Sequence, residues 1–254
     1  MIQVQNLSKV FTTQNNAEGF KVIDNLSFSI ARGEKVGIVG ATGCGKSTFL
    51  RIVLGVEKPS EGRVLVDGRE QYKEYNYFKG RITAVFQEDR LLPWRTAIDN
   101  VKLGLEIMNR DKNEAVKEAM RWLERLGLGK FAFAYPSELS GGMRQRVAIA
   151  RALIMNPEVV LLDEAFGHLD EVTSRRLRHD FFELLGESGT TVIMVTHNLD
   201  EALESVDRII VFGRPAHVLG DFKLSNHDPK DLKFILQRLI ELNVPIYQLN
   251  AGKL

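Results

Sequence analysis

The chain has 254 residues, with 34 Lys and Arg against 33 Asp and Glu and a net charge of +1, so no global field favours nucleic acid or an anionic membrane surface. Its 44% hydrophobic content includes no run of the roughly 20 apolar residues that a membrane-spanning helix needs, and its first residues lack a signal-peptide pattern. The single cysteine, Cys44, excludes an internal disulfide framework and a cysteine-rich metal site. We therefore expect a cytoplasmic protein that has no redox chemistry and binds no nucleic acid.

Two kinds of strand pattern run along the chain. In the first 30 residues and around residues 62–66, apolar side chains alternate with polar ones, which predicts an antiparallel β-lobe. Further on, short apolar runs bounded by Gly and Pro alternate with amphipathic segments, as in strands joined by crossover helices. The predicted fold class is therefore α/β, with this antiparallel lobe beside the core. The expected buried strands are residues 35–39, 159–162, 191–195 and 208–212, and ITAVF before Gln87 is also expected to be a strand.

Residues 40–47 read GATGCGKS, between the apolar strand KVGIV and the helix-compatible segment TFLRIVLG. In the spacing G-x-x-x-x-G-K-[ST], a P-loop, backbone N–H groups surround the β- and γ-phosphates of a nucleotide at a helix N-terminus. Lys46 is expected to place its charge on those phosphates, and Ser47 its hydroxyl on Mg²⁺. Cys44 is either a thiol activated by the helix N-terminus or a small buried side chain, and we favour the second. The predicted nucleotide ligands in this loop are Gly40, Ala41, Thr42, Gly43, Cys44, Gly45, Lys46, Ser47 and Thr48.

Between Asn113 and Phe131, apolar residues recur at helical spacing, which predicts a helical insertion outside the sheet. The apolar face is expected to consist of Val116, Met120, Leu123 and Leu126.

Polar side chains follow two of the predicted core strands. VVLLDE ends in Asp163 and Glu164, and a carboxylate at the carboxyl end of such a strand points into the crevice where ligands bind. Asp163 is expected to hold Mg²⁺ through water and Glu164 to act on the attacking water. His197 follows the strand TVIMV, where a neutral imidazole can donate a hydrogen bond to the γ-phosphate.

Near the C-terminus, DPKDLKFILQRLIEL opens with a capping Asp228 and a Pro at the first helical position. This helix either packs on its own domain or docks on a partner subunit, and we favour packing. The predicted apolar stripe is Leu232, Ile235, Leu236, Leu239 and Ile240.

A second anion cradle is predicted at LSGGMRQRVAIARAL, residues 139–153, where Ser140 and the backbone N–H groups of Gly141 and Gly142 stand at a helix N-terminus. The pattern LSGGxxQR closely resembles the signature of ATP-binding cassette (ABC) ATPases. The resemblance implies an ABC ATPase fold: a P-loop core, the antiparallel β-lobe and a helical subdomain that carries the signature. The implied domains are residues 1–220, with a helical subdomain at about 88–156, and a C-terminal helical extension over 221–254.

The resemblance implies further site residues, and the chain follows the family's motif order up to about Phe212. ATP and Mg²⁺ are the implied ligands, and the signature of one copy is expected to close on the P-loop ATP of another in a homodimer. Phe11 takes the place of an adenine-stacking tyrosine, with a core phenylalanine as the alternative. Gln87 matches a glutamine that reaches Mg²⁺ and the attacking water, and Asp170 matches the D-loop aspartate. In that loop, His168 departs from the usual alanine and Leu169 fits.

The stretch after Gln87 resembles one branch of the family. Leu91, Leu92, Pro93 and Trp94 are similar to the importers of nitrate, sulfonate and taurine. An apolar wedge beside Gln87 can receive a short helix of a membrane permease, with lobe core as the alternative. The resemblance implies a peripheral subunit at the cytoplasmic face of the inner membrane, linked indirectly to a solute-binding protein outside. An exporter ATPase and a non-transport ABC ATPase remain alternatives, and the solute is not predictable because the ATPase does not contact it.

Overall fold

The structure is a computed structural model that describes residues 2–13, 16–167, 170–186 and 189–246. The chain divides into two compact units. The first unit comprises Met1–Phe78 and Thr191–Leu254, and the second comprises Lys79–Thr190. Within the described residues, every helix is too short or too polar to cross a membrane.

The first unit begins with a sheet of four strands: β1 (Ile2–Thr13), β2 (Asn16–Ile30), β4 (Glu61–Val66) and β5 (Arg69–Glu70). The order is β2-β1-β4-β5, and every neighbouring pair is antiparallel. Val4 lies opposite Phe28 on one side and Val64 on the other. Its alternate residues Ile2 and Val4 are buried, as expected of a sheet with one face on the core. The predicted antiparallel β-lobe is therefore confirmed.

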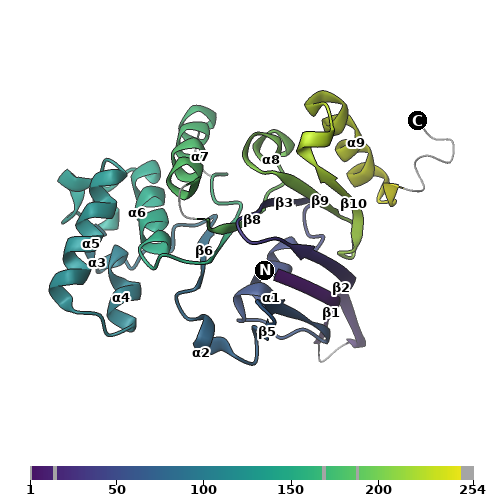
Figure 1. Cartoon of the computed structure of the whole chain (residues 1–254), viewed down its shortest axis with the longest axis horizontal. Helices are drawn as coiled ribbons and strands as arrows, with labels where there is room; N and C mark the ends of the chain where they lie inside the picture. Colours follow the sequence, from purple (N-terminus) through teal and green to yellow (C-terminus); the bar gives the residue numbers. More distant parts are fainter. Residues whose placement is uncertain (1, 14–15, 168–169, 187–188, 247–254) are drawn as a thin grey trace. The chain divides into compact units, whose positions relative to one another are not determined.

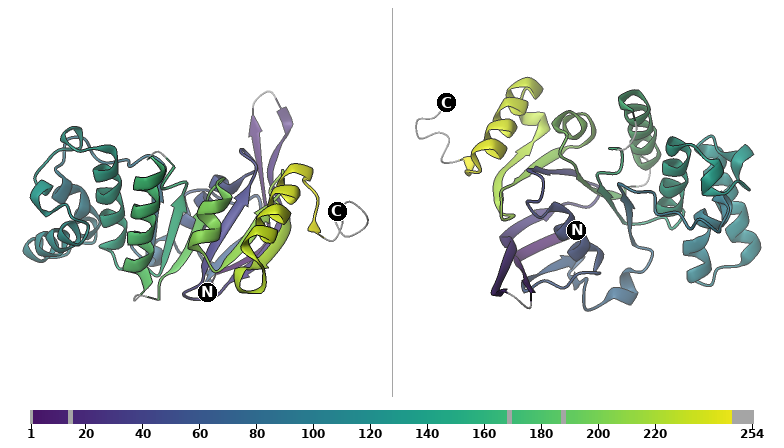
Figure 2. Two further views of the ribbon diagram at one scale, coloured as in Figure 1. Left: turned by 90° about the horizontal axis from the view of Figure 1, so that it is seen from above. Right: turned by 180° about the vertical axis from the view of Figure 1, so that it is seen from behind.

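The parallel part of the first unit is built around β3 (Lys35–Gly40), which lies between β8 (Thr191–Val195) and β9 (Arg208–Phe212) and is parallel to both. β10 (Val218–Lys223) continues this sheet antiparallel to β9. The helices of this unit are α1 (Lys46–Leu54), α2 (Tyr75–Phe78), α8 (Leu199–Ser205), α9 (Pro229–Leu242) and the 3₁₀ turn η3 (Leu224–Asn226). Figures 1 and 2 show α8 and α9 on one face of this sheet and α1 on the other.

An aromatic cluster fixes α1 on this sheet. The ring of Phe49 on α1 lies 5.7 Å from that of Phe212 on β9 and 5.5 Å from that of Phe28 on β2, measured between centroids. All of these distances fall in the range of favourable edge or tilted ring contacts. Because α1 starts at the P-loop, the cluster also anchors that loop.

The C-terminal helix α9 packs on α8 and β9 of its own unit, which is the arrangement we favour from the sequence. Its start is capped by Asp228, whose carboxylate accepts from the backbone N–H of Lys230 at 2.9 Å. Leu232, Leu236 and Leu239 are buried. Ile235 and Ile240 are only half-buried, so the stripe is narrower than predicted.

β10 runs across residue 220, where the sequence suggests a boundary between the ABC domain and its C-terminal extension. The predicted domain boundaries stay a prediction.

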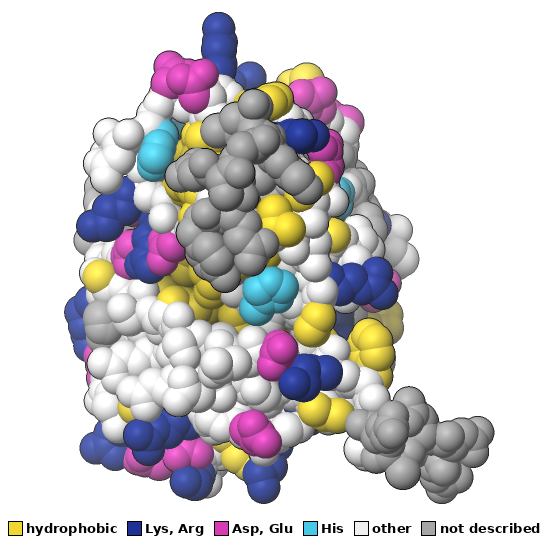
Figure 3. Space-filling view, turned by 90° about the vertical axis from the view of Figure 1, so that its right-hand side faces the viewer, with side chains coloured by type: hydrophobic (Ala, Val, Ile, Leu, Met, Phe, Trp, Pro, Cys, Tyr) yellow, Lys and Arg dark blue, Asp and Glu magenta, His cyan; other side chains and the backbone are white. Residues whose placement is uncertain are grey.

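On the face of the molecule in Figure 3, hydrophobic side chains are interspersed with charged side chains of both signs.

The second unit holds two parallel strands, β6 (Ile82–Phe86) and β7 (Val159–Asp163), and a group of helices. The signature helix, α6, contacts α3, α5, α7 and β6, so it is the central helix of this unit. The helices are α3 (Ala97–Val101), α4 (Leu103–Ile107), α5 (Lys112–Arg125), α6 (Gly141–Leu153), α7 (Glu171–Gly186) and the 3₁₀ turns η1 (Gly129–Phe131) and η2 (Pro136–Glu138).

The predicted helical insertion is present as α5, but its apolar face is displaced from the predicted one. Ala115, Ala119 and Leu123 are its buried residues, whereas Val116 is exposed. Small alanines allow close approach of a neighbouring helix, so packing selects them over the larger valine one position along. The predicted apolar face is therefore confirmed at Leu123 and Leu126, which are buried, and wrong at Val116.

Candidate active site

The P-loop, residues 40–48, takes a shape that requires glycine. Gly43 and Gly45 have φ of 75° and 112°, in the left-handed region. A Cβ on Gly40 would lie 2.5 Å from the carbonyl oxygen of Phe212, and one on Gly45 would lie 2.8 Å from that of Val22. Because Gly45 is also the N-cap of α1 and has no side chain, the first N–H groups of the helix face whatever the loop encloses.

Lys46 lies within this loop and is only 5% exposed. Its Nζ donates to the carbonyl oxygens of Gly40 at 2.7 Å and Ala41 at 3.1 Å. The ammonium group is therefore held at the loop rather than extended into solvent, and it supplies a fixed positive charge there.

Cys44 is the neighbour of this lysine inside the loop. It is 1% exposed, and burial raises the pKa of its thiol, while the nearby Lys46 ammonium acts in the opposite direction. A buried thiol with a raised pKa has little thiolate at neutral pH. The structure thus favours the small buried side chain over the reactive thiol.

His197 emerges at the same sheet edge as the P-loop. β3 and β8 are parallel neighbours with Ile38 opposite Val195, so their carboxyl ends meet at one edge of the first unit. The hydroxyl of buried Thr196 donates to Glu201 at 2.6 Å, and the Asn198 side chain caps α8. These contacts fix the backbone on both sides of His197, whose own side chain is exposed.

In the second unit, a parallel pair of strands brings Gln87 and the acid pair to one edge. Phe86 of β6 lies opposite Asp163 of β7, so Gln87 and Glu164 follow at matching positions. Glu164 has φ of 49°, a left-handed conformation that costs a non-glycine residue about 1–2 kcal/mol. Such strain persists where surrounding structure enforces it, often at active sites, and here it sets the direction of a predicted catalytic carboxylate.

The signature serine caps α6. Ser140 accepts at its Oγ from the backbone N–H of Met143 at 3.3 Å, and its side chain is exposed, as is Gly141. The preceding residue, Leu139, is buried and anchors the turn. This helix N-terminus therefore presents its donors at an open surface.

Two residues singled out by resemblance have contacts that the sequence does not reveal. Phe11 is 38% exposed on β1, opposite Phe20, and the Nζ of Lys9 lies 4.6 Å from its ring centroid, so it is no core residue.

Asp170 accepts from the backbone N–H of Thr173 at 2.9 Å, and that hydrogen bond lowers the pKa of its carboxyl. It thereby caps α7 in addition to any role across a dimer. His168 and Leu169 lie outside the described residues.

The segment 91–94 is shaped by a residue that the sequence analysis missed, Asn100 of α3. Its buried side chain accepts from the N–H of Leu92 at 2.8 Å and donates to three carbonyl oxygens. Leu91 is 8% exposed and belongs to the core, whereas Trp94 is 71% exposed. The alternative of lobe core thus applies to Leu91 and not to Trp94.

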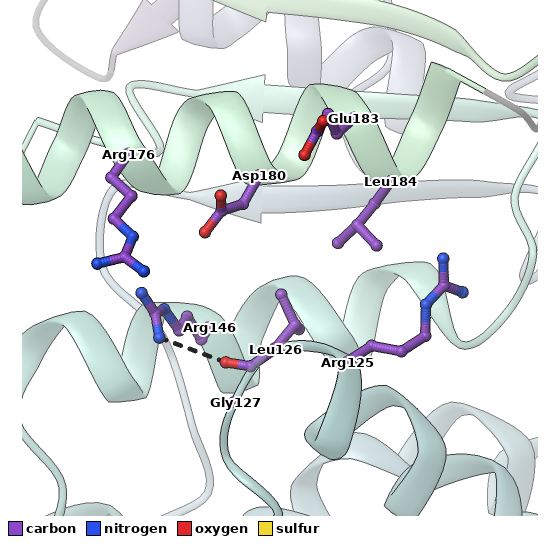
Figure 4. Close-up of a pocket in the computed structure, with 8 residues that line it drawn as sticks. All are labelled: Arg125, Leu126, Gly127, Arg146, Arg176, Asp180, Glu183 and Leu184. Carbon is purple, nitrogen blue, oxygen red and sulfur yellow. Dashed lines mark hydrogen bonds between the residues drawn. The ribbon is translucent and has the colours of Figure 1, made fainter.

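Among the described residues of the second unit, the signature helix borders a pocket on each of two sides. One, of about 420 Å³, is lined by residues 87–90 after β6 and by Gly141, Arg144, Gln145 and Ala165. The other, of about 510 Å³, lies among α5, α6 and α7, where Arg146 donates to the carbonyl oxygen of Leu126 at 3.3 Å (Figure 4). Residues predicted for the active site line the first pocket only. The second is lined by Arg125, Leu126, Gly127, Arg146, Arg176, Asp180, Glu183 and Leu184.

A family model for ABC transporters matches residues 23–167. The chain belongs to the ABC transporter family. This ABC protein is 39% identical over 247 residues, 96% of its length and 90% of the relative's, to an uncharacterised ABC transporter ATP-binding protein of Methanocaldococcus jannaschii. It is 40% identical over 210 residues to an aliphatic sulfonates import ATP-binding protein of Bacillus thuringiensis, covering 83% and 80% of the two chains. It is also 39% identical over 229 residues to a nitrate transport protein of Klebsiella oxytoca, covering 87% and 84%.

A solved dimer of an ATP-binding cassette in a post-hydrolysis state, bound to ADP and phosphate, is similar to this ABC protein with a TM-score of 0.79. The sequences are 34% identical, and the match covers 88% of this chain and 99% of the other. Together these findings confirm the predicted ABC ATPase fold, the binding of ATP and the ATP hydrolase class. They leave the individual site residues and the domain boundaries as predictions.

The donors at the predicted metal position suit Mg²⁺. Mg²⁺ prefers hard oxygen ligands, and Ser47 at the start of α1, Asp163 at the end of β7 and the amide oxygen of Gln87 are all of that type. Each comes at the end of a strand or the start of a helix, where the backbone fixes its direction.

Proposed function

We propose that this ABC ATPase works as a head-to-tail homodimer that powers the import of a small anion. Each ATP lies between the P-loop of one copy and the signature of the other, and hydrolysis releases the two copies from each other. The observation that carries the proposal is the contrast between two helix N-termini. The N-terminus of α1 lies in the P-loop, which encloses the buried Lys46. The N-terminus of α6 is an exposed turn capped by Ser140, which offers hydrogen-bond donors to a ligand from outside its own unit.

The residue roles follow from where charge develops during phosphoryl transfer. Water attacks the γ-phosphorus and gives its proton to Glu164, while the bond from that phosphorus to the bridging oxygen breaks, which leaves ADP and phosphate. The hydrogen-bond donors that stabilise the charge on the transferred group are Lys46, Ser140, Gly142 and His197. Mg²⁺, when bound by Ser47, Gln87 and, through water, Asp163, neutralises charge on the phosphates. Phe11 stacks on the adenine, and Asp170 faces the partner copy.

Import of an anion is supported by the named relatives and by the segment 91–94. The relatives at 39–40% identity are described as an aliphatic sulfonates import protein and a nitrate transport protein. Trp94 is exposed in a segment whose backbone Asn100 holds at Leu92 and Arg95, seven positions after Gln87, and such an aromatic side chain suits packing against a permease helix. We infer a subunit at the cytoplasmic face of the membrane, with permeases at Leu91–Trp94 and a solute-binding protein that acts through them.

The variant Glu164→Gln tests the dimer directly. Without the carboxylate the water is not activated, so turnover should fall to background while MgATP still binds. ATP should then convert the protein from monomer to dimer in size-exclusion chromatography with light scattering, and ADP should not. Hydrolysis at the wild-type rate by this variant would exclude the role of Glu164, and a protein that stays monomeric with ATP would exclude the ATP-linked dimer.

A further inference from the structure

The signature helix is attached to the loop that follows Gln87 through Arg144 and Arg151, and to the backbone before Gln87 and after Glu164 through Gln145. We call these three side chains the loop clamp. The Nε of Arg144 lies 2.9 Å from the Oδ2 of Asp89, across 55 positions of sequence. The same guanidinium donates through Nη1 to the carbonyl oxygen of Leu139 at 2.8 Å. Leu139 directly precedes Ser140, so one side chain joins the loop to the turn that carries the signature serine.

Arg151 binds the same loop through its backbone. Its Nη1 donates to the carbonyl oxygen of Arg90 at 2.7 Å and its Nη2 to that of Asp89 at 2.6 Å. Arg90 has φ of 47°, so the loop turns sharply at this residue to direct both carbonyls at the helix. Seven positions separate Arg144 from Arg151, which is two helical turns and hence one face of α6.

Gln145 completes the loop clamp on the buried side. Its Nε2 donates to the carbonyl oxygen of Ala165 and, at 3.4 Å, to that of Phe86. These carbonyls belong to the residue that follows Glu164 and the residue that precedes Gln87. A single buried amide therefore joins the backbones from which both predicted catalytic side chains emerge.

The loop clamp continues into the segment 91–94. The other oxygen of Asp89, Oδ1, accepts from the backbone N–H of Leu91 at 3.1 Å. The polar path therefore runs from Leu91 through Asp89 and Arg144 to Leu139, next to Ser140. Charge-assisted hydrogen bonds of this kind are stronger and shorter than neutral ones, and the two side chains are partly shielded from solvent.

We propose that Arg144 is a positioning residue that couples the segment 91–94 of one copy to the ATP held by the P-loop of the other copy. The inference rests on the proposed function, because Ser140 acts on the partner's ATP only in a head-to-tail dimer. A displacement of the segment 91–94 pulls on Asp89, and through Arg144 it moves the Leu139–Ser140 turn relative to the γ-phosphate. By this path each permease contact controls hydrolysis at the ATP of the opposite P-loop.

The test uses the full-length chain and four variants: Arg144→Gln, Asp89→Asn, the double variant and Arg144→Lys. MgATP affinity is measured with a fluorescent ATP analogue, since it depends on the P-loop of the first unit and should stay within twofold. In the two single variants kcat should fall about tenfold with KM unchanged, in the range expected for coupling between sites. The double variant should be no worse than either single one, because both remove the same bond. Arg144→Lys keeps the charge and should recover part of kcat.

The matched control is Arg121→Gln, which breaks an exposed ion pair with Glu118 on α5 and should leave every parameter unchanged. Hydrogen exchange adds a readout that simple destabilisation does not give. In Asp89→Asn, the peptide covering residues 139–143 should exchange faster, while that covering P-loop residues 40–48 stays as in wild type. Wild-type kcat in both single variants, or additive losses in the double variant, would overturn the inference. A wild-type protein that neither hydrolyses ATP nor dimerises with it would instead overturn the proposed function.

Discussion

The two helix N-termini predicted to hold phosphate, those of α1 and α6, are built in opposite ways. α1 follows Gly45, whose φ of 112° is open to glycine alone, and no side chain caps it. α6 follows Ser140 in an ordinary extended conformation, with φ of −65° and a hydroxyl that caps Met143. The P-loop is therefore an enclosure that is formed within one chain. The signature is a standard capped helix end, which gains a phosphate only when another molecule brings one.

Removal of the P-loop charge is expected to have the largest effect on ATP binding and hydrolysis. Lys46→Ala should weaken MgATP binding about 10–100-fold, the size of a lost charge-assisted hydrogen bond, and should abolish measurable hydrolysis. Affinity is measured by isothermal titration calorimetry and turnover by phosphate release. The control Lys130→Ala removes an exposed lysine of the second unit and should change neither. Intact binding by Lys46→Ala would contradict the view that the enclosure is complete within one chain.

Ser140→Arg should distinguish the role of the P-loop in ATP binding from the role of the signature in hydrolysis. We expect binding of MgATP to persist and hydrolysis to fall about 100-fold or more, as when a transition-state donor is lost. Ser137→Arg, at an exposed serine of η2 three positions earlier, is the matched control and should keep its activity.

A mixing experiment sharpens this prediction. Lys46→Ala and Ser140→Arg are each inactive alone, but in a head-to-tail heterodimer the intact P-loop of one faces the intact signature of the other. An equal mixture should therefore regain up to about a quarter of wild-type turnover, since half of the dimers are mixed and each has one complete site. A mixture as inactive as its components would contradict composite sites.

The adenine contact should contribute less to ATP binding and turnover than the P-loop or the signature. Phe11→Ala should weaken ATP affinity about 5–50-fold, and Phe11→Tyr should preserve it, because stacking requires only the ring face. Phe20 lies opposite Phe11 in the sheet register and is exposed, so Phe20→Ala is the control with little expected effect. Equal losses from both variants would assign Phe11 to lobe stability instead of the adenine.

Treatment with a thiol reagent directed at Cys44 should have the smallest effect on ATPase activity. Because burial raises the pKa of its thiol, the thiol stays protonated at neutral pH. It becomes nucleophilic only when the pH rises above the ordinary pKa of a cysteine thiol. Iodoacetamide at pH 7.5 should leave Cys44 unmodified by mass spectrometry and ATPase activity unchanged, whereas the urea-unfolded chain should be labelled. Rapid labelling of the folded protein would show that the loop exposes this residue.

Sequence patterns predict local features of this molecule well. The core strands at 35–39, 159–162 and 191–195 are found within a residue or two, because buried parallel strands are short apolar runs with turns at both ends. Glycine at positions 43 and 45 is predictable for a similar reason, since the left-handed backbone that requires it is a local feature of the P-loop turn.

Contacts between residues far apart in sequence are not predictable in this way. Nothing near Arg144 indicates that it binds Asp89, and nothing near Asn100 indicates that its amide shapes the segment 91–94. The buried face of α5 is another such case, since Val116 is the better hydrophobic residue and only the shape of the neighbouring helices selects Ala115 and Ala119. The left-handed backbone of Glu164 likewise depends on its surroundings rather than on residue type.

The outward position of Trp94 gives this protein a built-in optical probe. The chain has only two tryptophans, and the other, Trp122, lies on α5 with the guanidinium of Arg125 4.8 Å from its ring centroid. Replacement of Trp122 by phenylalanine leaves one indole, whose emission reports the polarity around the docking segment alone. A permease that covers it would shift that emission to shorter wavelength, so assembly could be followed in real time without any attached dye.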